Sequence, residues 1–113
     1  MGVGKVAVFY IPSNKLAKAR NGLHRFLVDN YKAYTHERGG IKGYWTGGSG
    51  LKEDRHERYE VSFDGDENFK KLVGFLSDMC GRIHEESIYL TIADESYLVK
   101  PTSRPCKSYY IRV

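Results

Sequence analysis

Residues 39–64 read GGIKGYWTGGSGLKEDRHERYEVSFD and contain the only tryptophan of the chain, Trp45. Residues 41–46 alternate between the two sides of an extended backbone, and residues 58–63 alternate as apolar and polar, which predicts two β-strands. Residues 47–57, rich in glycine and charge, are longer than a tight hairpin needs and predict a flexible polar connection between them. The stretch is therefore predicted to form two antiparallel strands at the middle of the fold.

On either side of this stretch the pattern predicts one strand and one helix. Valine and aromatic residues predict a buried strand over residues 5–11 that ends at Pro12, and amphipathic spacing predicts a helix from there to Arg38. A second amphipathic helix is predicted to start near Asp66 and to stop at Gly81. Further strands are predicted over residues 88–92, 97–99 and 108–113.

The order strand, helix, strand, strand, helix, strand predicts an α+β fold, the ferredoxin-like βαββαβ sandwich. This plan has one mainly antiparallel sheet with two helices on one face, and strands that flank a helix are expected to be parallel neighbours. Residues 1–100 are expected to form a single domain. Residues 101–113 are expected to form a basic tail or an extra edge strand.

Composition narrows the class of protein. The chain has 113 residues, a formal net charge of +4 and two cysteines, Cys80 and Cys106, too few for a disulfide framework. No apolar run is long enough to span a bilayer and no signal peptide is evident, so a cytoplasmic protein with no membrane partner is predicted. The first helix and the tail are basic, which either steers an anionic partner or is ordinary solvated surface. The open face of the predicted sheet favours a homo-oligomer.

No motif predicts a catalytic site, a metal site or a cofactor. The glycines of residues 47–50 lack the Lys-Ser/Thr pair of a phosphate loop, so a plain hairpin is favoured. The histidines His24, His36, His56 and His84 have no paired ligand spacing. Cys106 lies beside basic residues but has no placed base, and is interpreted as a surface thiol.

Aromatic and basic residues are interleaved in two places. Rings can stack on a nucleobase while Arg and Lys pair with phosphate, which predicts a site for a nucleotide or a nucleic acid. Recognition of another protein uses the same residue types. The predicted ligand-binding residues are Tyr44, Trp45, Arg55 and Arg58 in the central stretch, and Arg104, Lys107 and Tyr109 in the tail.

Several segments carry a resemblance to a known group of proteins: FLVDNY (residues 26–31), GGIKGYWTGG (39–48), ERYEVSF (57–63) and EESIYL (85–90). The pattern resembles a family of small uncharacterised bacterial and phage proteins of ferredoxin-like plan. In that family the last strand follows Gln-Glu, where this chain has Glu85-Glu86. The resemblance implies the fold and carries no activity.

Three functions are compatible with these features. The first is a small non-catalytic binding protein that captures an anionic ligand, such as a phage accessory or counter-defence factor. The second is an inhibitor that docks on a host enzyme through the open sheet face or the acidic residues 53–60. The third is a small enzyme that uses Glu60 with His84 or Glu86 as acid and base.

Overall fold

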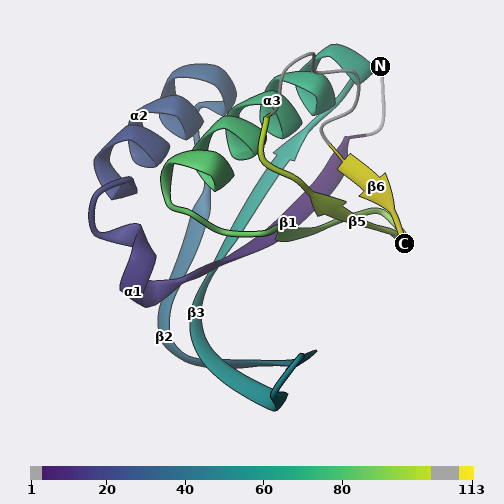
Figure 1. The fold of residues 1–113 in the computed structure, drawn as a ribbon. Helices are drawn as coiled ribbons and strands as arrows, with labels where there is room; N and C mark the ends of the chain where they lie inside the picture. Colours follow the sequence, from purple (N-terminus) through teal and green to yellow (C-terminus); the bar gives the residue numbers. More distant parts are fainter. Residues whose placement is uncertain (1–3, 103–109) are drawn as a thin grey trace.

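The computed structural model describes residues 4–102 and 110–113, and its centre is an antiparallel sheet that carries helices on one face (Figure 1). The strands lie in the order β2-β3-β1-β4-β5-β6, and β1 is therefore internal, paired with β3 on one side and β4 on the other. The elements are β1 (Lys5–Pro12), α1 (Ser13–Leu16), α2 (Arg20–Tyr31), β2 (Thr35–Gly47), β3 (Gly50–Phe63), α3 (Asp66–Arg82), β4 (Ile88–Ile92), β5 (Glu95–Val99) and β6 (Tyr110–Arg112).

The predicted ferredoxin-like βαββαβ sandwich is wrong. The sheet has six strands and the described chain has three helices, one of them only four residues long. Strands that flank a helix are not parallel neighbours: β3 separates β1 from β2, β1 separates β3 from β4, and every pairing is antiparallel. Alternation of apolar and polar residues identifies a strand but does not show which other strand it pairs with. The pairing depends on contacts between segments that are distant in the sequence.

The first predicted helix is shorter than expected and is divided. A turn over residues 17–19 separates α1 from α2, and α2 ends where Lys32 adopts a φ of 70° and donates its N–H to the Val28 carbonyl. The chain is already in β2 at Thr35, because the His36 ring stacks on Tyr59 with centroids 4.2 Å apart. This tertiary contact outweighs the local helical pattern that extends to Arg38.

The core lies between the sheet and the two longer helices. Alternate residues of the inner strands point into it, and α2 contacts α3 through Phe26 and Phe75, whose ring centroids are 4.1 Å apart. Figure 1 shows α2 and α3 side by side over this face. The buried strand residues include Ala7, Phe9, Ile11, Tyr59, Val61, Ile88, Leu90, Ile92, Tyr97 and Val99.

The other face of the sheet carries no helix among the described residues. The side chains that alternate with the core residues point there, and Val6 and Tyr89 are 46% and 41% exposed. Tyr10 and Leu98 on this face are half-buried. An uncovered face with this many apolar groups can form one wall of a binding site.

The β2–β3 hairpin extends beyond the rest of the sheet as an arm, defined here as residues 41–54 (Figure 1). Residues 51–57, predicted to be a loop, belong to β3. Residues 51–56 pair with β2 and Glu57 pairs with Ile11 of β1, so the turn is only Gly48-Ser49. The pairing shifts register between Glu37 and Ile41, where Gly39 and Gly40 have φ values of 67° and 74°. This bulge needs glycine and bends the ribbon.

Two buried groups, Tyr59 and Cys80, and the partly buried Tyr31 make the fold sensitive to alkali. Burial raises the pKa of Tyr31 to about 12 and raises the pKa of Tyr59 as well, while burial and the charge of Glu85 raise the pKa of Cys80 to about 11. In the unfolded chain these groups ionise from about pH 8.5 to 10. From about pH 8.5 upward, the unfolded state releases these protons while the folded state still holds them. The stability that these groups contribute is therefore complete below about pH 8.5 and is lost as the pH rises.

We therefore expect the urea midpoint to fall continuously between about pH 8.5 and 11. The Cys80→Ala variant is the matched control, because the same titration should give a shallower slope once the thiol is gone. A midpoint that stays constant over this range, or an unchanged slope in the variant, contradicts the expectation.

Candidate functional site

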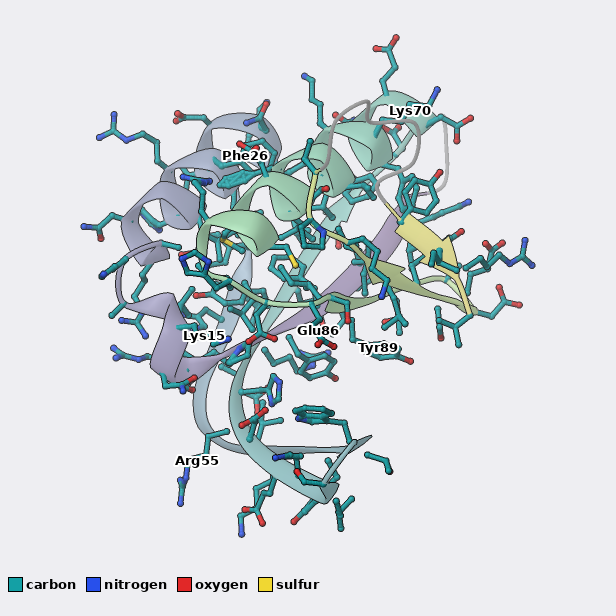
Figure 2. All side chains as sticks on the ribbon, in the orientation of Figure 1. Lys15, Phe26, Arg55, Lys70, Glu86 and Tyr89 are labelled. Carbon is teal, nitrogen blue, oxygen red and sulfur yellow. The ribbon has the colours of Figure 1, made fainter. Side chains whose placement is uncertain are left out.

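A groove of about 900 Å³ lies between the arm and the body of the protein. It is lined by residues of the arm, of the open sheet face and of the loop between α3 and β4. Figure 2 shows Glu86 and Tyr89 on the side of the body that faces the arm. The volume is in the range of small-molecule sites, about 300–1,000 Å³.

Trp45 forms part of the arm wall of the groove, and its orientation is set by two neighbours. Its Nε1–H donates to Asp54 Oδ2 at 2.9 Å, across the hairpin. A Cβ atom at Gly47 would lie 2.9 Å from the Trp45 ring, so a larger residue would push the ring out of this position along the strand. The ring remains 45% exposed and can accept a stacked ligand.

His56 lies at the base of the arm and depends on a second glycine. A Cβ atom at Gly43 would lie 2.5 Å from the His56 ring, which occupies that space. Its Nδ1 is 3.3 Å from the Asp54 carbonyl oxygen. Gly43 and Gly47 therefore leave room for aromatic rings against the backbone. For Gly47, this role differs from both the phosphate loop and the plain flexible hairpin that the sequence suggested.

The floor of the groove is aromatic and comes from the open sheet face. Tyr10 of β1 and Tyr89 of β4 stack with ring centroids 6.3 Å apart and an interplanar angle of 26°. The Tyr89 hydroxyl is 3.1 Å from Ser96 Oγ. Leu98 of β5 adds apolar surface beside them.

The loop between α3 and β4 forms the acidic wall of the groove. Glu85 Oε1 is 2.6 Å from Lys15 Nζ, so its charge is compensated. Glu86 also lines the groove and makes no ion pair or hydrogen bond with any residue that the structure describes. Gly81, predicted to stop the helix, lies inside α3, and His84 occupies the left-handed position with a φ of 60°.

The groove is nearly balanced in charge. Three carboxylates (Asp54, Glu85, Glu86) and two lysines (Lys15, Lys42) line it, together with two histidines. Asp54 accepts from Trp45 and Glu85 pairs with Lys15, so Glu86 is the carboxylate left without a partner among the described residues. This balance differs from the basic cleft that a polyphosphate needs.

The structure brings together only part of the predicted ligand set. Trp45 and Tyr44 line the groove, although the pairing of Tyr44 with Glu53 places it on the other face of the arm from Trp45. Arg55 points away from the groove (Figure 2). Arg58 lies on the sheet, paired with Glu60 at 2.7 Å, and this hydrogen bond raises the pKa of Arg58. Arg104, Lys107, Tyr109 and Cys106 lie outside the described residues.

Sequence reasoning missed most of the groove. Both Tyr10 and Lys15 line the groove. Tyr10 lies in a strand predicted to be buried, and no sequence pattern distinguishes Lys15 from the other bases of the first predicted helix. The outward position of Tyr89 in its strand was visible from alternation, but nothing in the sequence linked it to the arm. Glu60 does not line the groove, whereas His84 and Glu86 do, so the predicted pairing of Glu60 with either residue is not supported.

A separate buried cluster lies under the start of α2. Glu57 is 3% exposed and its two oxygens are each 2.6 Å from a partner, Arg20 Nη2 and His36 Nε2. Arg20 Nε is buried and has no hydrogen-bond partner within residues 4–102 and 110–113. Because Glu57 is enclosed, residues 53–60 do not form a continuous acidic docking surface.

Within residues 4–102 and 110–113 there is no cluster of three or more potential metal ligands. The helices in the same part of the chain are also too short or too polar to cross a membrane.

Comparison of the sequence with protein-family models and with curated proteins found no match. Among solved structures, a phage SAM lyase in complex with S-methyl-5'-thioadenosine is similar to this chain, with a TM-score of 0.60 and 15% sequence identity. The alignment covers 88% of this chain and 92% of that chain. At this identity the likeness concerns the fold alone, and this chain shares its fold with that phage protein.

Proposed function

We propose that the groove binds an adenine nucleoside whose 5' substituent is neutral or cationic, of the kind represented by S-methyl-5'-thioadenosine and S-adenosylmethionine. The observation that carries the proposal is the combination, in one groove, of exposed aromatic rings with a carboxylate, Glu86, that has no partner among the residues described by the structure. The shared fold with a phage SAM lyase that holds such a nucleoside supports the same ligand class.

The aromatic residues suit the flat base of the ligand. Trp45 on the arm and the Tyr10–Tyr89 pair on the sheet present rings to the same groove. Stacking of a base on an aromatic side chain contributes about 1–3 kcal/mol and does not require charged side chains. An adenine placed between arm and floor would contact both sets of rings.

The charges favour a ligand that is not strongly anionic. The Lys15 ammonium is occupied by Glu85, and Lys42 is paired with Glu53 at 3.7 Å. A sulfonium cation, by contrast, is stabilised both by a carboxylate and by the faces of aromatic rings. The anionic nucleotide or nucleic acid predicted from the sequence fits this groove less well than S-adenosylmethionine does.

A lyase activity on S-adenosylmethionine is a second candidate, favoured by the position of Glu86. When the bond between sulfur and the amino-acid chain breaks, its electron pair goes to sulfur and the sulfonium becomes a neutral thioether. In the same step, either a base removes a proton from the adjacent carbon and a C=C bond forms, or the carboxylate of the chain attacks the carbon that leaves sulfur and closes a lactone. Glu86 could accept that proton or hold the cation in place, in line with general-base or electrostatic catalysis.

The Glu86→Gln variant tests the charge requirement. We expect it to weaken binding of S-adenosylmethionine about tenfold, or about 1.4 kcal/mol, because the amide no longer balances the sulfonium. Binding of the neutral S-methyl-5'-thioadenosine should change less than about twofold. Titration calorimetry gives both dissociation constants, and chromatography of the S-adenosylmethionine sample reports whether thioether accumulates.

Glu67→Gln is the matched control, since Glu67 is an exposed acid of α3 that does not line the groove. Accumulation of the thioether by wild type, lost in Glu86→Gln, favours the lyase, whereas tight binding without turnover favours capture. The proposal is overturned if neither nucleoside binds, or if ATP binds more tightly than both.

Binding or removal of such a nucleoside suits the phage accessory or counter-defence factor predicted from the sequence. The homo-oligomer and the cytoplasmic location remain predictions. For the inhibitor alternative, charge reversal at Glu57 is unsuitable as a test because the residue is buried. Glu53 is exposed and remains usable for that purpose.

A further inference from the structure

We infer that Lys15 is a positioning residue of the groove: it holds the α3–β4 loop in the conformation that presents Glu86. The inference rests on the proposed function for the identity of the ligand, but its structural part concerns this chain alone. Lys15 lies in α1, while the loop is almost seventy residues later in the sequence, so the contact is purely tertiary.

The loop begins with a helix-ending motif that is strained. The N–H of His84 donates to the Gly81 carbonyl at 3.2 Å, and the N–H of Glu85 donates to the Cys80 carbonyl at 3.0 Å. These two bonds form a Schellman motif, whose left-handed position is usually glycine. Here it is His84, with a φ of 60°, and a non-glycine residue in this region costs about 1 kcal/mol or more. Contacts from side chains offset this cost, and one of them is the bond from Cys80 Sγ to the Glu85 carbonyl oxygen at 3.3 Å.

Lys15 supplies two such contacts. Its Nζ donates to the His84 carbonyl oxygen at 3.0 Å and lies 2.6 Å from Glu85 Oε1. The position of Lys15 is itself well determined, because the next residue, Leu16, is completely buried. His84, the strained residue, and Glu85 are thereby both bonded to Lys15 of α1.

The same contacts determine which carboxylate faces the ligand. With Glu85 held by Lys15, the neighbouring Glu86 is the one that remains unpartnered among the described residues of the groove. Without Lys15, Glu85 and Glu86 would both be available to a cationic ligand. The strained loop would also be free to rearrange. Lys15 also connects the loop to β1, which carries the Tyr10 of the floor.

Two measurements on the full chain test the inference. In Lys15→Met without ligand, we expect hydrogen exchange of the His84 and Glu85 amides to accelerate about tenfold, since the loop opens more often. In titrations with S-methyl-5'-thioadenosine, we expect binding to weaken about tenfold, because the displaced α3–β4 loop no longer contacts the ligand in the same position. Lys15→Arg, which can donate to both the carbonyl and the carboxylate, should restore both values to within about threefold of wild type.

Lys18→Met is the control, because Lys18 is an exposed base only three residues away. In the Glu85→Gln background, Lys15→Met should add less than its effect in wild type, as expected when two residues act through one contact. Unchanged exchange in Lys15→Met overturns the inference whatever the ligand does. Accelerated exchange in a protein that binds no nucleoside would retain Lys15 as the anchor of the loop and overturn the proposed function instead.

Discussion

Replacement of Glu57 by alanine is expected to lower the free energy of unfolding by about 3 kcal/mol, a large part of the stability of a small domain. The carboxylate is 3% exposed and is the shared partner of Arg20 and His36. Its removal leaves the Arg20 guanidinium without its anion, next to an Nε that already lacks a partner among the described residues. The cluster joins the first turn of α2 to β2 and β3, so three elements lose their common contact.

Glu60→Ala is the matched control for this prediction. Glu60 lies on the same strand and is also bonded to an arginine, Arg58 at 2.7 Å, but its side chain is 37% exposed. An exposed pair of this type contributes about 1 kcal/mol or less. Urea unfolding of both variants at neutral pH gives the comparison. Equal losses in the two variants would mean that burial of Glu57 does not govern its contribution.

Replacement of Trp45 by alanine is expected to weaken binding of S-methyl-5'-thioadenosine about 10- to 100-fold, the range for loss of one base-stacking ring. The ring is held by its bond to Asp54 and by the space above Gly47, so it meets the ligand without further ordering. Because the ring is already 45% exposed, its removal should change the melting temperature little. Calorimetric titration and thermal unfolding of the same sample separate the two effects.

Leu51→Ala provides the control for Trp45. Leu51 belongs to the same arm and is 73% exposed, but it does not line the groove. Its replacement removes apolar surface from the arm and should leave the dissociation constant unchanged within about twofold. If both variants bind the nucleoside as wild type does, the arm is not a wall of the site.

Local patterns predicted several elements correctly. The apolar run of residues 5–11 forms β1, the alternation of residues 58–63 forms the end of β3, and the spacing of Phe69, Leu72, Val73 and Leu76 forms α3. Each of these signals depends on neighbours within one or two turns or along a single strand. The tryptophan and glycine cluster also marked the arm as unusual.

The remaining features depended on contacts between distant segments. The helical pattern extends to Arg38, but β2 begins at Thr35. The reason is that the His36 ring stacks on Tyr59 and is hydrogen-bonded to Glu57. The polar residues 51–57 look like a loop in isolation, and they form a strand because β2 pairs with residues 51–56 and β1 with Glu57. The sequence pattern places Gly47 in a flexible connection and Gly43 in a strand, and it does not show that each leaves space for an aromatic ring.

The sequence by itself determined where β1, α3 and the end of β3 lie and which of their faces are apolar, because periodicity is a local property of the chain. Only the tertiary structure decided the strand order, the extension of the arm and the groove that joins Trp45, Tyr89 and Glu86. The physical reason is that strand pairing and side-chain seating are set by partners far away in sequence. The bonds of Lys15 to His84 and Glu85 in the α3–β4 loop are one such long-range contact, absent from any local pattern.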